Sequence, residues 1–264
     1  MRKILLALSA AVTFGCAAQN YVLEKDVPYY AGTDTYAKER CKVDVYHPTD
    51  AAGLPVVVWF HGGGLTGGNK SVPEELKNSG YVVMAANYRL IPNVEIDSCI
   101  TDAARMVKWA ADNAEKYGGD PKKLFVSGHS AGGYLTSMVG LDKKWLADCG
   151  MDADSIRGLF PYSGQVITHF ALRQRRGMSE KQPLVDEYAP LYHVRPDAPP
   201  YIIITGDKEQ EMLGRYEENA YMWRMMKVAG HPDVQIYKLD GYDHGAMAAP
   251  AHHILKTQIA RILK

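Results

Sequence analysis

Along most of the chain, short apolar runs alternate with segments in which apolar residues recur at helical spacing. Residues 55–60 ("PVVVWF") and 81–87 ("YVVMAAN") are continuous apolar runs, which are typical of parallel strands covered on both faces. Residues 41–48 ("CKVDVYHP") alternate between polar and apolar, which predicts a half-exposed strand. Further strands are predicted at residues 123–126, 158–164, 201–206 and 234–241.

Helices are predicted between these strands. Within residues 93–118, apolar residues recur at helical spacing and two glycines end the run. Similar spacings predict a helix over 213–230 and a final helix over 255–263. This alternation predicts an α/β fold, an open and mostly parallel sheet with helices on both faces, which binds ligands at the carboxyl ends of its strands. Residues 165–200 show no clean period and are interpreted as an insertion over that edge, a candidate lid.

The first twenty residues, "MRKILLALSAAVTFGCAAQN", have the pattern of a secretory signal: two cations, an apolar run and then small residues. We expect residues 1–18 to be removed after Ala18, leaving 19–264 as a single domain in the periplasm or outside the cell. Cys16 leaves open a lipoprotein anchored to the membrane. The sequence around Cys16 is a poor lipobox, because Thr13 stands where leucine is usual.

Charge and cysteine content narrow the possible partners. The 264 residues include 30 Lys and Arg against 30 Asp and Glu, so nothing suggests a nucleic-acid or anionic-membrane surface. A small or neutral molecule is the expected partner. Cys41, Cys99 and Cys149 have spacings that match no disulfide framework or metal site, so at most one disulfide is expected and its pairing stays open.

The stretch "VSGHSAGGYL" places Ser130 between Gly128 and Gly132, after a predicted strand and before an apolar helical run. Glycines at these positions allow a turn so tight that the serine hydroxyl projects above the sheet at a helix N-terminus. The pattern G-x-S-x-G in this context is typical of a nucleophilic serine.

A glycine-rich loop, "FHGGGLTGG", follows the strand at 55–60. Glycines expose backbone amides to an approaching negative oxygen, and the loop lies where a hydrolase with this sheet forms its oxyanion hole. The amide of Ala131 would supply a further donor.

A serine nucleophile needs a base, and the base needs an acid. His244, in "LDGYDHGAM", follows the last predicted strand and is the candidate base, whereas His129 is expected to line the turn. The loop after residues 201–206 holds three candidate acids: Asp207, Glu209 and Glu211. The chain order serine, acid, histidine is the one that the fold requires.

Taken together, these motifs resemble the α/β-hydrolase superfamily, and within it the hormone-sensitive-lipase-like carboxylesterases, the feruloyl and acetyl-xylan esterases and the kynurenine formamidases. The resemblance rests on "HGGG", "NYRL", "DPKKLFVSGHSAGGYL", "APLYHVRPDAPPYIIITGDKE" and "GYDH", which occur in the family's order. It implies an α/β-hydrolase fold of about eight strands. It also assigns the nucleophile to Ser130, the base to His244 and the oxyanion amides to Gly63, Gly64 and Ala131.

The departures from the family pattern bear on the expected substrate and on which residue is the acid of the triad. His129 and Asn87 stand where Asp is common, which favours the feruloyl-esterase and formamidase branches, and Leu65 replaces a large aromatic residue that often shapes the acyl pocket. The resemblance implies that the acid is the third residue after the strand's final glycine. That residue is Glu209, with Asp207 as the alternative.

The resulting prediction is a secreted serine esterase for short-chain or aryl esters, acting on an acylated polysaccharide or a plant-derived ester, with no metal or organic cofactor. An arylformamide hydrolase is the nearest alternative, and a catalytically silent hydrolase fold used for binding is the alternative from another class. A nucleotide-binding protein is disfavoured, because "GHSAGG" lacks the ending of a phosphate-binding loop.

Overall fold

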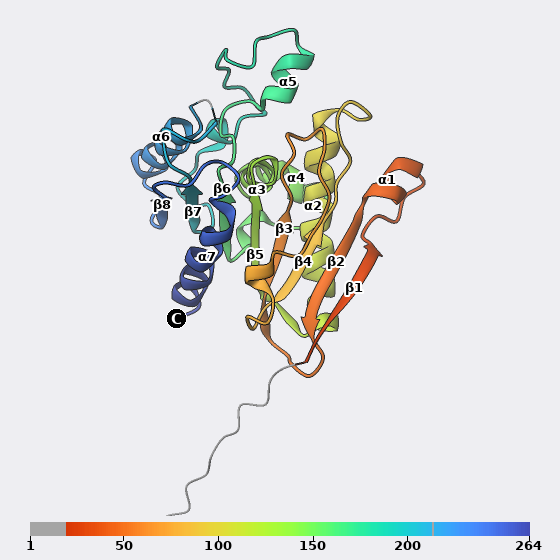
Figure 1. The fold of residues 1–264 in the computed structure, drawn as a ribbon. Coiled ribbons are helices and arrows are strands. Elements are labelled where there is room, and N and C mark those ends of the chain that lie inside the picture. Colours follow the sequence, from red (N-terminus) through yellow and green to blue (C-terminus); the bar gives the residue numbers. More distant parts are fainter. Residues whose placement is uncertain (1–19, 213) are drawn as a thin grey trace, which may run out of the picture.

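The computed structural model describes residues 20–212 and 214–264, so the predicted signal at 1–18 and Cys16 lie outside the described residues. Eight strands form one sheet in the order β1-β2-β4-β3-β5-β6-β7-β8 (Figure 1). The two pairs that include β2 are antiparallel and the remaining pairs are parallel, which confirms the predicted mostly parallel sheet. The strands are β1 (Tyr21–Pro28), β2 (Lys42–Pro48), β3 (Leu54–Phe60), β4 (Val82–Ala86), β5 (Gly119–His129), β6 (Gly158–Tyr162), β7 (Tyr201–Thr205) and β8 (Val234–Lys238).

Helices cover both faces of the sheet. The α-helices are α1 (Thr35–Arg40), α2 (Ile96–Asn113), α3 (Ala131–Leu141), α4 (Lys143–Ala147), α5 (Phe170–Arg175), α6 (Arg215–Val228) and α7 (Ala248–Ile262). Short 3₁₀ helices are η1 (Glu74–Leu76), η2 (Glu115–Tyr117), η3 (Ala153–Ser155) and η4 (Pro190–His193). Side chains of α2, α3 and α6 belong to one apolar core and those of α7 to a second, so the sheet lies between two buried layers.

The alternation of side chains along β3 explains the continuous apolar run. Val56, Val58 and Phe60 point into the core beneath α2 and α3, whereas Val57 and Trp59 point into the core beneath α7. A strand covered on both faces needs apolar residues at every position.

The carboxyl ends of three central strands lie side by side. Phe60 at the end of β3 pairs with Gly128 of β5, and His129 of β5 pairs with Tyr162 at the end of β6. The loops that leave these strands therefore meet at one edge of the sheet, which is where the glycine-rich loop and Ser130 were predicted to come together.

Two elements near the N-terminus were not predicted from the sequence. Strand β1 lies at the edge of the sheet, and most of its side chains are exposed, so "YVLEKDVP" has no buried face to leave a period in the sequence. Helix α1 has only six residues and begins at Asp34, whose side chain accepts a hydrogen bond from the amide of Ala37 at 2.9 Å.

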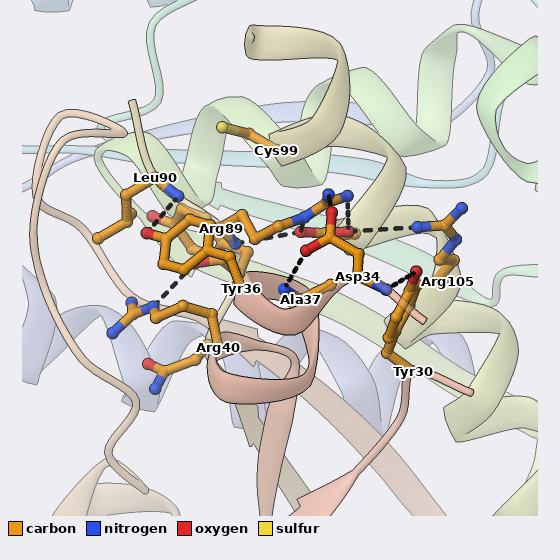
Figure 2. Close-up of polar contacts among 12 residues, drawn as sticks. Tyr30, Asp34, Tyr36, Ala37, Arg40, Arg89, Leu90, Cys99 and Arg105 are labelled. Atoms are coloured by element: carbon orange, nitrogen blue, oxygen red, sulfur yellow. Dashed lines mark hydrogen bonds and ion pairs between the residues drawn. The ribbon is translucent and has the colours of Figure 1, made fainter. Parts of the chain in front are cut away.

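A buried ion pair fixes the segment that follows β4. Arg89 donates from Nε to Asp102 Oδ2 and from a terminal nitrogen to Asp102 Oδ1, both at 2.7 Å, and Asp102 lies on α2. Figure 2 shows Arg89 also reaching Asp34 at the start of α1, at 2.9 Å. One guanidinium thus joins the chain after β4 to two helices.

The insertion at residues 165–200 connects β6 to β7 and contains α5 and η4. It contacts the glycine-rich loop, because a Cβ built on Gly64 would lie 2.9 Å from the ring of Phe170. Its position over the carboxyl edge is thus as predicted (Figure 1), and its movement as a lid stays a prediction.

Two further observations concern the pairing of the cysteines and the helices of the described residues. Cys41, Cys99 and Cys149 are all free thiols, so none of the possible disulfides is formed among the described residues. Within residues 20–212 and 214–264, no helix combines the length and the apolar character needed to cross a membrane.

Candidate active site

Ser130 lies on a strained turn between β5 and α3. Its backbone has φ 56° and ψ −113°, a conformation that non-glycine residues rarely adopt and that concentrates at functional sites. A Cβ on Gly132 would lie 2.0 Å from the carbonyl oxygen of Phe60, and one on Gly128 would lie 2.5 Å from the backbone of Gly132. The glycines are therefore required by close backbone approach, as the sequence pattern predicted.

The structure brings Ser130 and His244 together. His244 follows β8, and its Nε2 lies 2.9 Å from Oγ of Ser130. Nδ1 of the same ring lies 2.7 Å from Oε2 of Glu211. An ionised carboxylate can only accept, so Nδ1 carries the proton and Nε2 accepts the hydrogen bond from the serine hydroxyl. The three side chains form the arrangement of a nucleophile, a base and an acid that orients the base.

Glu211 is held as an anion by donors around it. Its side chain is only 1% exposed. Its Oε1 accepts hydrogen bonds from the amide of Gly206 at 2.9 Å and from the hydroxyl of Ser163. Burial alone would raise the pKa of Glu211, but the hydrogen bonds from His244, Ser163 and Gly206 outweigh it and lower the pKa to about 2. The carboxylate is therefore charged at neutral pH.

The prediction that Glu209 contacts the imidazole is wrong, and so is the alternative, Asp207. The Glu209 side chain is 77% exposed and pairs with Lys208 at 3.1 Å. Asp207 accepts hydrogen bonds from the amides of Glu209 at 2.9 Å and Gly241 at 2.8 Å, so its carboxylate fastens the loop.

The physical reason is the local fold of this loop. The amides of Gln210 and Glu211 both donate to the carbonyl of Asp207, at 3.0 and 2.8 Å, so the chain makes a tight turn immediately after Gly206. The turn directs Glu209 outward and brings Glu211 back over the end of β7. Asp207 at the start of "GDKEQE" favours such a turn, and this signal in the sequence could have directed attention to the third acid rather than the second.

The glycine-rich loop lies against the serine. A Cβ on Gly62 would lie 3.3 Å from Cβ of Ser130. Gly63 and Gly64 have φ values of 111° and 64°, and among the described residues neither amide donates a hydrogen bond to another protein group. Ala131 is the first residue of α3, so its amide also has no acceptor within the helix. These three amides are the donors assigned to the oxyanion hole by the resemblance.

Two histidines support the site without contacting the hydroxyl of Ser130. Nε2 of His129 donates to the carbonyl of His244 at 2.6 Å, which fastens the loop of the base to the turn, in line with the role expected for His129. Burial, and then the charge of His244, lower the pKa of His129 to about 4. His61 stacks on Tyr88 at 4.5 Å between ring centres, and burial lowers its pKa to about 4 as well. Both rings are therefore neutral at neutral pH.

A cavity of about 540 Å³ opens beside the site. Its wall is formed by the insertion, including Phe170 and Arg173, and by the residues around the start of α6, including Met212 and Arg215. Within the described residues, no group of three or more His, Cys, Asp or Glu side chains is arranged to hold a metal ion.

Comparison with known proteins finds similarity to a family model and to esterases. Residues 43–155 match the model of the BD-FAE family. Esterase LipC of Mycobacterium tuberculosis is 25% identical over 221 residues, which cover 75% of this chain and 54% of LipC. The chain thus spans about half the length of this curated relative.

Solved structures share the fold over most of the chain. Thermogutta terrifontis esterase Est2 superposes with a TM-score of 0.70 at 23% identity, covering 90% of this chain and 92% of Est2. The same esterase has also been solved phosphorylated by paraoxon. A truncated carbohydrate esterase from gut microbiota superposes with a TM-score of 0.74 at 15% identity, covering 94% of this chain and 98% of that one. These structures confirm the α/β-hydrolase fold. The match to the BD-FAE model and the similarity to LipC support the resemblance to hormone-sensitive-lipase-like carboxylesterases.

Proposed function

We propose that this protein is a serine carboxylesterase in which Ser130 is the nucleophile, His244 the general base and Glu211 the acid of the triad. The observation that carries the proposal is the continuous chain of hydrogen bonds from Ser130 Oγ through His244 to Glu211, at 2.9 and 2.7 Å. The match to the BD-FAE family model and the likeness to LipC support the same reaction class.

In the proposed reaction, Oγ of Ser130 attacks the ester carbonyl while Nε2 of His244 takes the hydroxyl proton. The carbonyl oxygen becomes negative and accepts hydrogen bonds from the amides of Gly63, Gly64 and Ala131. The carbon–oxygen bond to the alcohol then breaks, and the alcohol leaves with the proton from His244. Water attacks the acyl-enzyme in the same way and releases the acid.

Glu211 acts through the imidazole. Its charge fixes the proton of His244 on Nδ1. It also stabilises the imidazolium that forms when Nε2 takes the proton of Ser130. Because Oε1 is held by Gly206 and Ser163, Oε2 stays directed at the ring.

The substrate that we propose is a short-chain or aryl ester, including acyl groups on a plant polysaccharide. The likeness to a carbohydrate esterase from gut microbiota favours this class. Rates on p-nitrophenyl acetate, butyrate and octanoate, measured beside acetylated xylan and methyl ferulate, would rank the acyl groups. Release of acetate or ferulate no faster than in the absence of enzyme would exclude the polysaccharide and plant esters.

The nucleophile is tested with Ser130→Ala. We expect the loss of turnover on p-nitrophenyl acetate to be on the order of a millionfold. Paraoxon should label a peptide containing Ser130 in the wild-type protein and leave the variant unlabelled. Ser71→Ala, which removes an exposed serine hydroxyl, is the matched control and should behave as the wild type. More than about a tenth of the wild-type rate in Ser130→Ala would show that another residue is the nucleophile.

We further propose that the protein is exported, on the basis of the charge and apolar pattern of residues 1–18. Expression of the full chain in a bacterium, followed by sequencing of the mature N-terminus, tests this. A chain that begins at Gln19 supports soluble export, and a lipid-modified Cys16 supports an anchored form. A cytoplasmic chain that still carries residues 1–18 would refute export.

A further inference from the structure

Two residues that line the cavity also contact residues of the candidate active site. Phe170 lines the cavity and contacts the oxyanion loop at Gly64. Arg215 lines the cavity and donates to the carbonyl of Ser163, whose hydroxyl in turn donates to Glu211. A group of a substrate bound at Ser130 could therefore extend into the cavity.

Two buried arginines form its inner wall. Arg173 is 2% exposed and Arg215 is 3% exposed. All the hydrogen bonds that they donate within the described residues end on main-chain carbonyls, those of Thr168, Gln182 and Ser163. Nε of Arg215 is buried and has no hydrogen-bond partner there.

Neither guanidinium has a carboxylate within salt-bridge distance among the described residues, in contrast to their neighbours. Arg175 and Arg176, which follow Arg173 closely, pair with Glu95 and Asp186 at the surface. A buried cation without an ion-pair partner is costly, because its hydration is lost and the main-chain carbonyls replace only part of it. The wall of the cavity is thus built in an energetically unfavourable state that a ligand anion would relieve.

The carboxylates around the cavity make no ion pair with this wall among the described residues. Glu180 and Glu217 line the cavity but are exposed, so water screens their charge. Glu218 is half-buried and accepts a hydrogen bond from the amide of Val166 at 3.2 Å. The charges of Glu218 and Glu211 both act on Arg215, but no carboxylate among the described residues forms an ion pair with either guanidinium of the inner wall.

We infer that the cavity binds a carboxylate group of the substrate, so that the preferred substrates are esters that carry a free carboxylate in their acyl or alcohol part. Arginine donors are arranged as a planar fork that matches a carboxylate, and Nε of Arg215 has no hydrogen-bond partner among the described residues. Apolar contacts with Phe170, Ile167 and Met212 would hold the carbon chain between the carboxylate and the ester. This inference rests on the proposed esterase function.

The experiment compares esters that differ only in one charge. In the acyl arm, mono-4-nitrophenyl glutarate is compared with its neutral methyl ester. In the alcohol arm, 4-acetoxybenzoate is compared with methyl 4-acetoxybenzoate. Each rate is divided by the uncatalysed rate of the same ester. In one arm we expect the charged member to have a kcat/KM about ten- to a hundredfold higher, mainly through a lower KM, as for hydrogen bonds to a charged group.

The variants assign that preference to the cavity. Arg215→Met should lower the ratio of charged to neutral kcat/KM by about tenfold or more. Arg224→Met is the matched control, because Arg224 lies exposed on the same helix and outside the cavity. The control should keep the wild-type ratio, and the ratio is independent of any general loss of activity in Arg215→Met.

The outcomes separate the inference from the proposed function. Hydrolysis of the neutral esters with no preference for the charged member in either arm would overturn the inference and leave the esterase intact. Hydrolysis of none of the four esters would overturn the proposed function. In that case the Tm of the wild-type protein in glutarate decides the inference: a rise in Tm that Arg215→Met loses supports carboxylate binding, and an unchanged Tm overturns it.

Discussion

Replacing Glu211 by glutamine tests the candidate triad at the point where sequence and structure differ. Oε1 of Glu211 accepts from Gly206 and Ser163, while Oε2 accepts from His244. A glutamine that keeps its carbonyl oxygen toward Gly206 turns its NH₂ group toward Nδ1 of His244. A donor at Nδ1 selects the imidazole tautomer with the proton on Nε2, which cannot accept the proton of Ser130.

The opposite orientation of the glutamine amide is also unfavourable. It would place the NH₂ group against the Gly206 amide, so that two donors face each other in a buried site. Neither orientation satisfies all the groups that the carboxylate satisfies.

The size of the effect has two parts. Lowering the pKa of Glu211 from its ordinary value of 4.5 to about 2 corresponds to about 3 kcal/mol of preference for the charged form. This figure combines the contributions of His244, Ser163 and Gly206 with the opposing effect of burial. Loss of a part of about 2.7 kcal/mol when His244 becomes an imidazolium would lower turnover by roughly a hundredfold. The unproductive tautomer adds to this, and the full loss of an orienting carboxylate is about 10⁴-fold.

The assay is kcat for p-nitrophenyl acetate with Glu211→Gln and with Glu209→Gln as the matched control. Both variants remove one negative charge from the same loop, but the Glu209 side chain is exposed and distant from the imidazole hydrogen bond. We expect Glu211→Gln to lose between about 10² and 10⁴ in kcat and Glu209→Gln to stay within about twofold. An inactive Glu209→Gln beside an unimpaired Glu211→Gln would refute the reasoning.

Three further predictions concern stability and the oxyanion loop. Because the pKa of Glu211 is lower in the folded protein than its ordinary value, the unfolded chain binds more protons between about pH 2 and 4.5. The stabilisation of about 3 kcal/mol is therefore present above pH 4.5 and is lost as the pH falls through about 2. In urea unfolding, the free energy of unfolding of Glu211→Gln should therefore fall less on acidification than that of the wild type. Asp102→Ala should cost about 3 kcal/mol in urea unfolding, because it leaves the buried Arg89 with the exposed Asp34 as its remaining carboxylate partner. A cost below about 1 kcal/mol would contradict the importance of the pair with Asp102. Gly63→Ala should lower the Tm as well as kcat, because its Cβ would lie 2.2 Å from the carbonyl oxygen of Gly67, and a normal Tm with reduced kcat would show that the loop accommodates the side chain.

The strands and the tight turn at Ser130 could be predicted because the constraints on them are short-ranged in sequence. A strand covered on both faces must be apolar at each position, as β3 and β4 are. The turn at Ser130 requires glycines within two residues, because neighbouring backbone would contact any Cβ there. The edge strand β1 faces no such requirement, and it left no pattern.

The acid illustrates a different kind of constraint. Asp207, Glu209 and Glu211 are chemically similar and lie within five residues, so composition and order do not separate them. What separates them is a set of hydrogen bonds between side chains and backbone: Asp207 holds the amides of Glu209 and Gly241, and the turn it starts returns Glu211 to Gly206. Gly241, Ser163 and His244 come from loops that are distant in sequence, and only the assembled sheet edge brings them to this turn.

The glycine-rich loop shows that the sequence can predict where a residue lies without predicting what surrounds it. "HGGG" indicated which glycines lie beside the serine, but not where a side chain on each would point. A side chain on Gly63 would meet the backbone at Gly67, whereas one on Gly64 would meet the ring of Phe170, which is the residue shared with the arginine-lined cavity. The absence of a side chain therefore allows the loop to close at Gly63 and the insertion to approach it at Gly64. Through the contact at Gly64, the insertion at residues 165–200 lies against both the glycine-rich loop and the cavity. A substrate group bound in the cavity would therefore pack beside the loop that we propose binds the ester oxygen.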